Sequence, residues 1–505
     1  MKIDQLTIHN FRCFDRTVLK LHPKITVIVA LNGQGKSTLL DAIKVALWPF
    51  VAGFDLGSTT NDATGIQIDD VLYEKTAPHE MEWRLPCTIA ARGKIVLPSL
   101  IFEDTPSKEK YIENKSKYFS WDEVRYRSSI KKNTKTKSNS ESDFVNLNFC
   151  AKNLEERIFS NRNFKPDDLP VLGYYGTGRL WSQKKLTGIF DKPDNETFSR
   201  TFAYRDCLDP SSSYKHFSQW YTRAFKSLRD AQIKNIEKNQ KINSKLDDIF
   251  LAPILNVQRA IDKILKTHTG WHQLEYSAEH EDLVLEHSEH GELKVSQLSD
   301  GIRNMLALVG DIAYRCYKLN SHHGKNAALL TKGIVMIDEV DMHLHPEWQQ
   351  TVLPDLQKAF PKIQFIVTTH SPQVLSSVDA KCIRRLDWEL KEENELDQRK
   401  IRKNGIRKRI SVKTITEQTM GVASSDVMAS VMEVDPIPDV APARQLSHYY
   451  ALIQQNLHLT PSGRALRKKL DSHFGTSHPK MLDCDRLIRL QAFKKKLSLR
   501  EISDA

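Results

Sequence analysis

The chain has 505 residues, of which 40% are hydrophobic and 27% are charged, a balance typical of a globular protein with roughly two to four domains. No apolar run reaches about 18 residues, which excludes a membrane-spanning helix, and the N-terminus lacks the apolar core of a signal peptide, so we expect a cytoplasmic location and no membrane partner. The net charge of +11 is equally compatible with DNA or RNA as a partner and with a merely basic surface.

The first elements of the chain are predicted to be strands. Residues 3–9 alternate between apolar and polar side chains, a second strand is expected near 17–21, and Ile25–Val29 is a nearly continuous apolar run typical of a buried strand. A glycine-rich segment follows at 30–38, and residues 39–48 have the composition of a helix. Strand, glycine loop and helix stand in the order that phosphate binding requires.

The segment 30–38, Ala-Leu-Asn-Gly-Gln-Gly-Lys-Ser-Thr, nearly matches the phosphate-binding P-loop. Two glycines let the backbone curl so that successive N–H groups face a phosphate. Lys36 would place its charge on the β- and γ-phosphates of ATP, and the Ser37 hydroxyl would be a Mg²⁺ ligand. Ala30 replaces the first glycine of the pattern, and we expect this to be tolerated if its φ stays negative. The predicted nucleotide-binding residues of this loop are Asn32, Gly33, Gln34, Gly35, Lys36, Ser37 and Thr38.

The composition changes several times after the loop. Residues 128–142 are rich in Lys, Ser, Asn and Thr and are predicted to form a surface loop, 213–267 have the apolar spacing of a helical hairpin, and Arg399–Arg409 is strongly basic. We therefore expect an N-terminal ATPase lobe (1–104), a polar insertion (105–168), a strand with a helical hairpin (169–290), a C-terminal ATPase lobe (291–390) and a basic, helical, partner-binding region (391–505).

An apolar strand at 334–337 ends in two acidic residues, Asp338 and Glu339. This is what a Walker B strand needs, because the first acid can hold Mg²⁺ and the second, one residue further on, can polarise the attacking water as a general base. The alternative interpretation is a buried strand whose exposed end happens to be acidic.

Two further segments complete a set of four. Ser299, Asp300 and Gly301 open a helix and resemble the ABC signature motif, although Ser299 would also suit a simple helix cap. His370 follows the apolar strand 363–369 at the place where ABC ATPases carry a switch histidine, although a histidine there can be purely structural. The order of the four segments resembles that of an ABC-type ATPase head, a mixed α/β sheet with flanking helices.

The resemblance extends to a particular group of heads. Phe11 and Arg12 look like the N-terminal turn of SMC and RecF proteins, whose arginine lies near the nucleotide, and the His-Leu-His-Pro of 343–346 resembles OLD-like ATPases. The combination is closest to the PtuA ATPases of Septu and retron-associated anti-phage systems. That resemblance implies ATP and Mg²⁺, and a homodimer or higher even oligomer in which Ser299 and Gly301 reach ATP bound to another copy. It further implies an HNH nuclease of the PtuB type as partner and, in some systems, a retron reverse transcriptase with its RNA–DNA hybrid.

Several alternatives stay open. OLD proteins carry a Toprim nuclease, but the acidic pairs at 433–435 and 483–485 lack the strands that this fold needs, so we expect no nuclease activity from this chain alone. His343 and His345 could be a metal pair or could shape the loop that faces a second copy. A RecF-like DNA-repair ATPase, the nucleotide-binding subunit of a transporter, and a nucleotide-dependent scaffold with negligible turnover are the competing functions.

Overall fold

The computed structural model describes eleven stretches of the chain, residues 1–56, 65–77, 80–95, 117–126, 134–135, 146–160, 166–178, 199–210, 214–237, 244–391 and 407–503. Most of the loop predicted at 128–142 and of the basic run predicted at 399–409 lies outside these residues. Residues Met1–Val427 form one compact unit and Met428–Ala505 form a second. No helix among the described stretches is both long enough and apolar enough to span a membrane.

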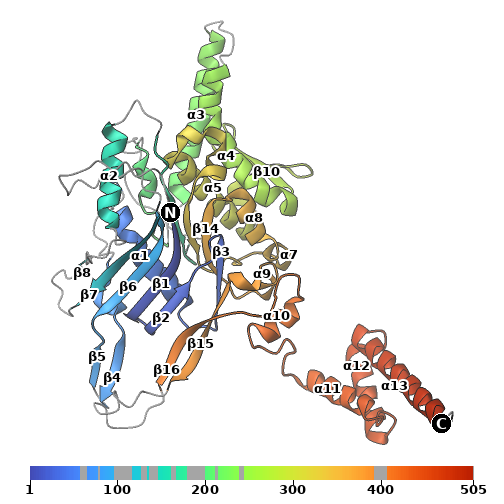
Figure 1. The fold of residues 1–505 in the computed structure, drawn as a ribbon. Helices are drawn as coiled ribbons and strands as arrows, with labels where there is room; N and C mark the ends of the chain where they lie inside the picture. Colours follow the sequence, from blue (N-terminus) through green and yellow to red (C-terminus); the bar gives the residue numbers. More distant parts are fainter. Residues whose placement is uncertain are drawn as a thin grey trace. The chain divides into compact units, whose positions relative to one another are not determined.

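A six-stranded sheet occupies the centre of the first unit (Figure 1). Four neighbouring strands, counted inward from one edge of this sheet, are parallel to one another and buried along their whole length. This burial on both faces explains why they are continuous apolar runs rather than alternating ones. In spatial order the strands are β16 (Arg407–Thr414), β15 (Ile383–Lys391), β3 (Ile25–Val29), β14 (Ile363–Thr368), β13 (Gly333–Ile337) and β9 (Val171–Tyr175).

A five-stranded antiparallel sheet stands against the first. Its order is β2 (Phe14–Lys20), β1 (Lys2–Phe11), β6 (Cys87–Ile95), β7 (Lys117–Arg125) and β8 (Thr134–Lys135). The buried amide of Gln364 joins the two sheets, because its Nε2 donates to Ile3 O at 2.7 Å and its Oε1 accepts the Ile3 N–H at 2.9 Å. A separate hairpin consists of β4 (Tyr73–Ala77) and β5 (Glu80–Trp83). The six-stranded sheet is mixed and the five-stranded sheet is antiparallel, and helices flank them. This arrangement confirms the predicted fold class.

Helix α1 (Lys36–Val51) runs from the glycine loop and packs against strands of both sheets. The indole Nε1 of Trp121 on β7 donates to Ala46 O at 2.8 Å and fixes the helix to the antiparallel sheet. Helix α2 (Leu147–Ser160) covers α1. Since β7 and α2 both lie within 105–168, the prediction of a loop-like insertion there was wrong for these two elements, whose apolar residues pack into the first unit.

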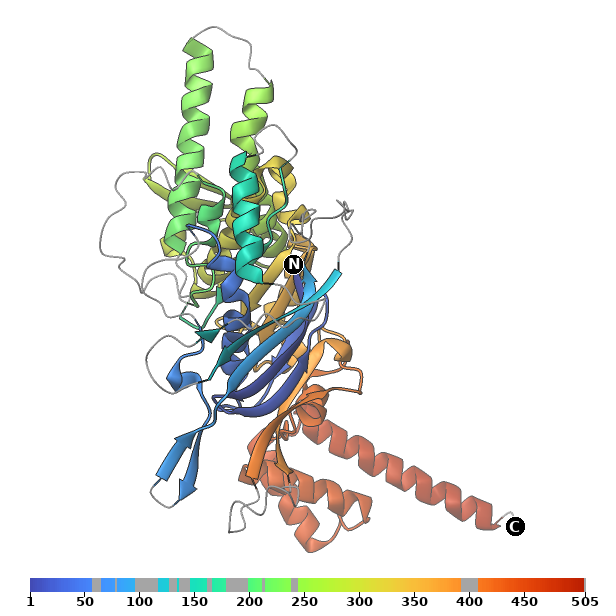
Figure 2. The ribbon, with the colours of Figure 1, turned by 60° about the vertical axis from the view of Figure 1, so that its left-hand side comes forward.

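The predicted helical hairpin is confirmed. Helices α3 (Tyr214–Glu237) and α4 (Ser244–Thr269) lie side by side and extend beyond the sheets (Figure 2). A small antiparallel sheet follows, with β10 (Trp271–Ser277), β11 (Asp282–His287) and β12 (Gly291–Lys294), and then helix α5 (Asp300–Leu319). The expectation for 169–290 had included the strand and the hairpin but not β10 and β11.

The remaining helices in the described part of the first unit are short. They are η1 (Ile68–Asp70), η3 (Thr201–Tyr204), η4 (Val295–Gln297), η5 (Ser321–Asn326), α6 (Ala327–Leu330), α7 (Pro346–Gln349), α8 (Val352–Ala359), α9 (Pro372–Leu375), η6 (Ala380–Cys382) and α10 (Ser424–Ser430), which crosses the boundary to the second unit.

The second unit is helical. Helices α11 (Ala441–Gln454), α12 (Pro461–Phe474) and α13 (Pro479–Ser503) enclose a small core of Tyr449, Ile453, Leu470, Met481 and Cys484. The region predicted as helical began at residue 391, and this was wrong for β16. Arg407–Thr414 forms a strand because it pairs with Arg384–Lys391 of β15 and its Ile410 is buried beside β2.

A buried ion pair lies beneath the central sheet. Arg315 and Asp311, one turn apart on α5, are 2.7 Å apart with side chains only 2% and 4% exposed. Asp311 also accepts the hydroxyl of Tyr175, the last residue of β9, at 2.7 Å. The guanidinium additionally donates to the carbonyls of Ala203 and Arg205. This network joins α5 to the sheet, to η3 and to the residue that follows η3.

We predict that Arg315→Met lowers the free energy of unfolding of the first unit by about 3–5 kcal/mol, because Asp311 would remain buried without its partner. Thermal unfolding followed by near-ultraviolet circular dichroism measures this. Lys358→Ala is the control, since its ammonium pairs with Asp355 but is 70% exposed, and its loss should cost less than about 1 kcal/mol. Equal losses in the two variants would contradict the importance of the buried pair.

Candidate active site

The glycine loop between β3 and α1 needs glycine at two positions. Gly33 and Gly35 both have positive φ, 79° and 86°, a backbone conformation that favours glycine. A Cβ on Gly35 would also lie 2.7 Å from Cys13 Sγ and 2.9 Å from Phe14 Cζ, so space is lacking as well. Ala30 is buried and is not among the residues with positive φ, so the alanine is accommodated as we expected.

Two side chains of the loop shape the loop itself. The buried Gln34 accepts the N–H of Leu31 through Oε1 at 2.9 Å, which closes the turn. The ammonium of Lys36 donates to the carbonyls of Ala30 at 3.0 Å and Leu31 at 3.3 Å, so it lies over the centre of the loop. Asn32 and Gly33 form the exposed tip. Burial lowers the pKa of Lys36, and the nearby carboxylates of Asp338, Glu339 and Asp341 oppose that shift.

The end of β13 meets the beginning of α1. Ser37 Oγ donates to Asp338 Oδ2 at 2.7 Å, across 301 residues of sequence. The Asp338 N–H donates to Tyr175 O at 2.8 Å, which continues the parallel pairing of β13 with β9 to this position. A hydroxyl and a carboxylate are the hard oxygen ligands that Mg²⁺ prefers, so the donor set fits that ion.

Thr368, the last residue of β14, holds the acidic pair in place and was not predicted. Its hydroxyl donates to Asp338 Oδ1 and accepts the N–H of Glu339 at 2.8 Å. Glu339 has a positive φ of 48°, and the half-buried side chain therefore leaves the line of the strand. The next residue, Thr369, donates to Asp341 Oδ1 at 2.6 Å. The sequence signal was a hydroxyl at the end of the neighbouring strand, which a pattern of buried β-branched residues conceals.

His370 follows these two threonines directly and is half-buried. Ser371 then begins α9 as its N-cap, with its hydroxyl accepting the Val374 N–H and donating to Gln349 Oε1 at 2.7 Å. The ends of β13 and β14 are adjacent in the sheet, so Asp338, Glu339 and His370 lie at one edge.

Arg12 lies beside α1 rather than over the loop. It pairs with Asp41, on the turn of α1 after Ser37, and with Asp70 at 2.8 Å, and its side chain is 39% exposed. Asp41 also accepts the hydroxyl of Tyr174 at 3.2 Å. In this structure Arg12 therefore connects the first strand turn to α1, and its predicted contact with nucleotide stays a prediction. Thr38 shares a hydrogen bond with Cys13, which lies next to Arg12.

The signature residues lie at a different place. Ser299 occupies the N-cap position of α5 but makes no side-chain cap hydrogen bond, and Asp300 pairs with Arg303. A pocket of about 260 Å³ is lined by Ser299, Gly301, Ile302, His268, Thr269, His343, His345, Glu347 and Trp348. None of the P-loop or Walker B residues lines it. Within one chain, the structure thus brings together the loop, Asp338, Glu339 and His370, but not the signature.

Gly301 packs against the loop after β13. A Cβ on Gly301 would lie 2.5 Å from the carbonyl oxygen of His343, which itself has a positive φ of 63°. His345 is the N-cap of α7, where its Nδ1 accepts the Glu347 N–H. Among the described residues, neither histidine belongs to a group of three or more metal-capable side chains. Their observed role is to shape the loop beside the signature.

Comparison with known proteins decides the family. A family model described as an AAA domain matches residues 5–268, and one described as an AAA ATPase domain matches residues 185–375. The chain belongs to the AAA-domain family. This AAA-domain protein is an ATPase, as predicted.

The relatives of this ATPase include retron ATPases and a Septu protein. The chain is 27% identical over 525 residues to the retron Ec83 probable ATPase of Escherichia coli, which covers 94% of this chain and 84% of that protein. It is 30% identical over 256 residues to the retron Vc95 probable ATPase of Vibrio cholerae serotype O1 biovar El Tor, covering 44% of this chain and 49% of that protein. The Septu protein PtuA of Bacillus mycoides (strain KBAB4) is 44% identical over 79 residues, 16% of this chain and 10% of that protein. These matches confirm the predicted relationship to the PtuA and retron ATPases.

We predict that Thr368→Val lowers the kcat of ATP hydrolysis about 10-fold to 100-fold, because Asp338 and the Glu339 N–H both lose a hydrogen-bond partner. Phosphate release at saturating ATP measures this. Thr26→Val is the matched control, since it removes another buried threonine hydroxyl, from β3, that does not contact the acidic pair. If the two variants hydrolyse ATP equally fast, Thr368 does not position these acids.

Proposed function

We propose that this ATPase is the nucleotide-driven subunit of a prokaryotic anti-phage defence complex, in which ATP binding and hydrolysis gate an HNH-type nuclease carried by a separate chain. The observation that carries the ATPase part is the hydrogen-bonded chain from Ser37 through Asp338 to Thr368, which joins the P-loop to the ends of β13 and β14. The defence part is supported by the similarity to retron ATPases along most of the chain and to PtuA in a shorter segment.

Each residue of the site has a proposed role. Lys36 and the backbone N–H groups of the loop bind the β- and γ-phosphates of ATP. Ser37 and Asp338 would hold Mg²⁺, whose charge would stabilise the phosphates. Glu339 accepts a proton from the attacking water as general base, and His370 contacts the γ-phosphate. Three carboxylates near Lys36 would repel a bound triphosphate. The positive charges of the lysine and of a cation would offset this repulsion, which supports the arrangement.

We propose further that the site is completed by a second copy. Ser299, Asp300 and Gly301 of one chain would face the nucleotide bound to the P-loop of another, in a homodimer or a higher even oligomer. Two observations support this. The signature lines a pocket without P-loop residues, and the Ser299 hydroxyl makes no cap bond that would explain its presence. ATP would then join two chains, and hydrolysis would separate them.

The second unit is the proposed contact region for the nuclease, and for a reverse transcriptase with its RNA–DNA hybrid where a retron is present. Exposed apolar side chains on this unit suit a protein partner, and the net positive charge of the chain suits nucleic acid. The large exposed apolar side chains among the described residues of this unit are Val434, Ile437, Val440, Leu457, Leu459, Leu482, Leu490 and Phe493. Asp483 and Asp485 lie on α13, and Asp485 pairs with Arg467 at 2.5 Å, which lowers the pKa of Asp485.

A mixing experiment tests the shared site. Lys36→Ala and Ser299→Arg should each be inactive alone, whereas an equal mixture should recover about a quarter of wild-type ATP turnover, since half of the pairs are mixed and each has one intact site of two. A mixture of Lys36→Ala with Glu339→Gln is the control and should recover nothing, because both changes fall in the same half-site. No recovery in the first mixture would contradict sharing.

Glu339→Gln separates an ATPase from a scaffold that binds ATP without turnover. We predict a fall in kcat of about 10²-fold to 10⁴-fold with ATP still bound, because the general base is lost while the loop is intact. Phosphate release and light scattering with ATP should show slow turnover and accumulated dimers. Wild-type turnover as slow as that of the variant would favour the scaffold.

Phage challenge tests the defence role. Cells with the complete system should resist phage, and Lys36→Ala should abolish resistance. A nuclease should co-purify with the wild-type chain. Strong stimulation of turnover by DNA without any dependence on a neighbouring nuclease would instead favour a repair ATPase like RecF.

A further inference from the structure

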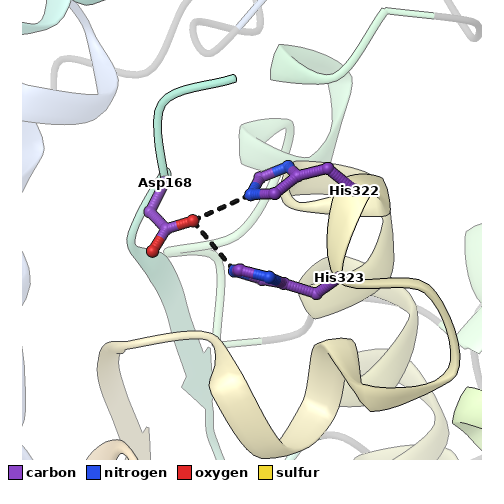
Figure 3. A group of neighbouring side chains, drawn as sticks. All are labelled: Asp168, His322 and His323. Carbon is purple, nitrogen blue, oxygen red and sulfur yellow. Dashed lines mark hydrogen bonds and ion pairs between the residues drawn. The ribbon is translucent and has the colours of Figure 1, made fainter. Parts of the chain in front are cut away.

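A cluster outside the nucleotide site brings three metal-capable side chains together (Figure 3). Asp168 lies just before β9, and His322 and His323 lie in η5, just after α5. The Nε2 atoms of the two histidines are 2.9 Å and 2.8 Å from the same oxygen, Asp168 Oδ1. Among the described residues, this is the one group of three or more such side chains whose ligand atoms all lie within 4.8 Å of one another.

Hydrogen bonding alone does not account for this cluster. His322 Nε2 is hydrogen-bonded to Asp168, whereas the buried His323 Nε2 faces the same carboxylate oxygen as an ion pair without the geometry of a hydrogen bond. The two imidazoles are mostly buried, with 17% and 18% of their side chains exposed, and their ring centroids are 4.2 Å apart. Two imidazole nitrogens that converge on one carboxylate oxygen, one of them in poor hydrogen-bond geometry, call for an explanation, and an ion bound between the three groups is one.

The backbone on both sides of the cluster is held rigidly by hydrogen bonds. Asn320, fully buried, accepts the Leu169 N–H at 2.8 Å and donates to Leu169 O at 2.9 Å, so the residue after Asp168 is clamped to the residue two before His322. Arg200 donates to Asp167 O and Leu319 O, both at 2.8 Å, and so bridges the same two segments at a second place. Ligands held in place before binding are typical of built metal sites.

The chemistry of the three ligands selects a class of metal. Imidazole nitrogens with one carboxylate suit Zn²⁺ and similar transition-metal ions rather than Mg²⁺ or Ca²⁺, which prefer oxygen. Tetrahedral ligands about 2.0–2.1 Å from zinc are about 3.3 Å apart, so the observed distances need to open by only a few tenths of an ångström. The positive charge of Arg200, which lies near His322, opposes the binding of a cation.

We propose that Asp168, His322 and His323 form a binding site for one divalent transition-metal ion of the zinc type, with water completing the coordination. The ion joins the segment that enters β9 to the segment that leaves α5. Strand β9 supports Asp338 through the Tyr175 carbonyl, and α5 carries the signature at its other end. The ion therefore stiffens the connection between the strand that supports Asp338 and the helix that carries the signature. This proposal does not depend on the defence function.

Zinc binding by the full-length chain, with any affinity tag removed and metal stripped by a chelator, tests the proposal. Titration with ZnCl₂ alone should show about one ion per chain, MgCl₂ should not compete, and saturating zinc should raise Tm by about 3–6 °C. Asp168→Asn and His323→Asn should each weaken zinc affinity about 100-fold or more and remove the Tm increase. CoCl₂ should give the visible absorption of a tetrahedral nitrogen–oxygen site in the wild type only.

His280→Asn is the matched control, since its Nε2 lies 3.7 Å from the carboxylate of Glu292 in an ordinary histidine–carboxylate pair. It should bind zinc like the wild type. Asp168→Asn replaces an exposed side chain with one of equal size and keeps the test valid if His323→Asn does not fold. The proposal is overturned if the wild type binds no zinc, or if Asp168→Asn binds zinc as tightly as His280→Asn does.

Discussion

The hydrogen bonds that meet at Asp338 are the constraint on which the rest of the head depends. One carboxylate oxygen accepts Ser37 from the start of α1, the other accepts Thr368 from β14, and the backbone N–H of the same residue continues the pairing with β9. Three segments separated by up to 301 residues of sequence are thereby fixed around one acid. Their alignment sets where the loop, Glu339 and His370 stand relative to one another.

Much of this site could be predicted because it is encoded locally. The P-loop needs glycine at positions of positive φ, so Gly33 and Gly35 are visible in the sequence, and the Walker B acids follow an apolar run that only a buried strand explains. Helical periodicity predicted the hairpin of α3 and α4 for the same reason, since each pattern is complete within one segment.

The features that were missed depend on contacts between distant segments. Thr368 looks like any β-branched residue of a buried strand until Asp338 is placed beside it. β16 lies in a basic stretch, and it is a strand because β15 offers it a free edge. Asp168 and His322 are 154 positions apart, and no spacing rule in the sequence connects them.

The contact between Gly301 and the His343 carbonyl has a consequence for how two copies would communicate. There is no room for a side chain between them, so a shift of the signature turn toward the loop after β13 would displace that loop. That loop begins at the acids proposed to act on the chain's own nucleotide, whereas the signature would face the nucleotide of the other copy. Each chain would then couple two nucleotide sites. The loss of a phosphate at one site would displace residues at the opposite site before the two chains separate.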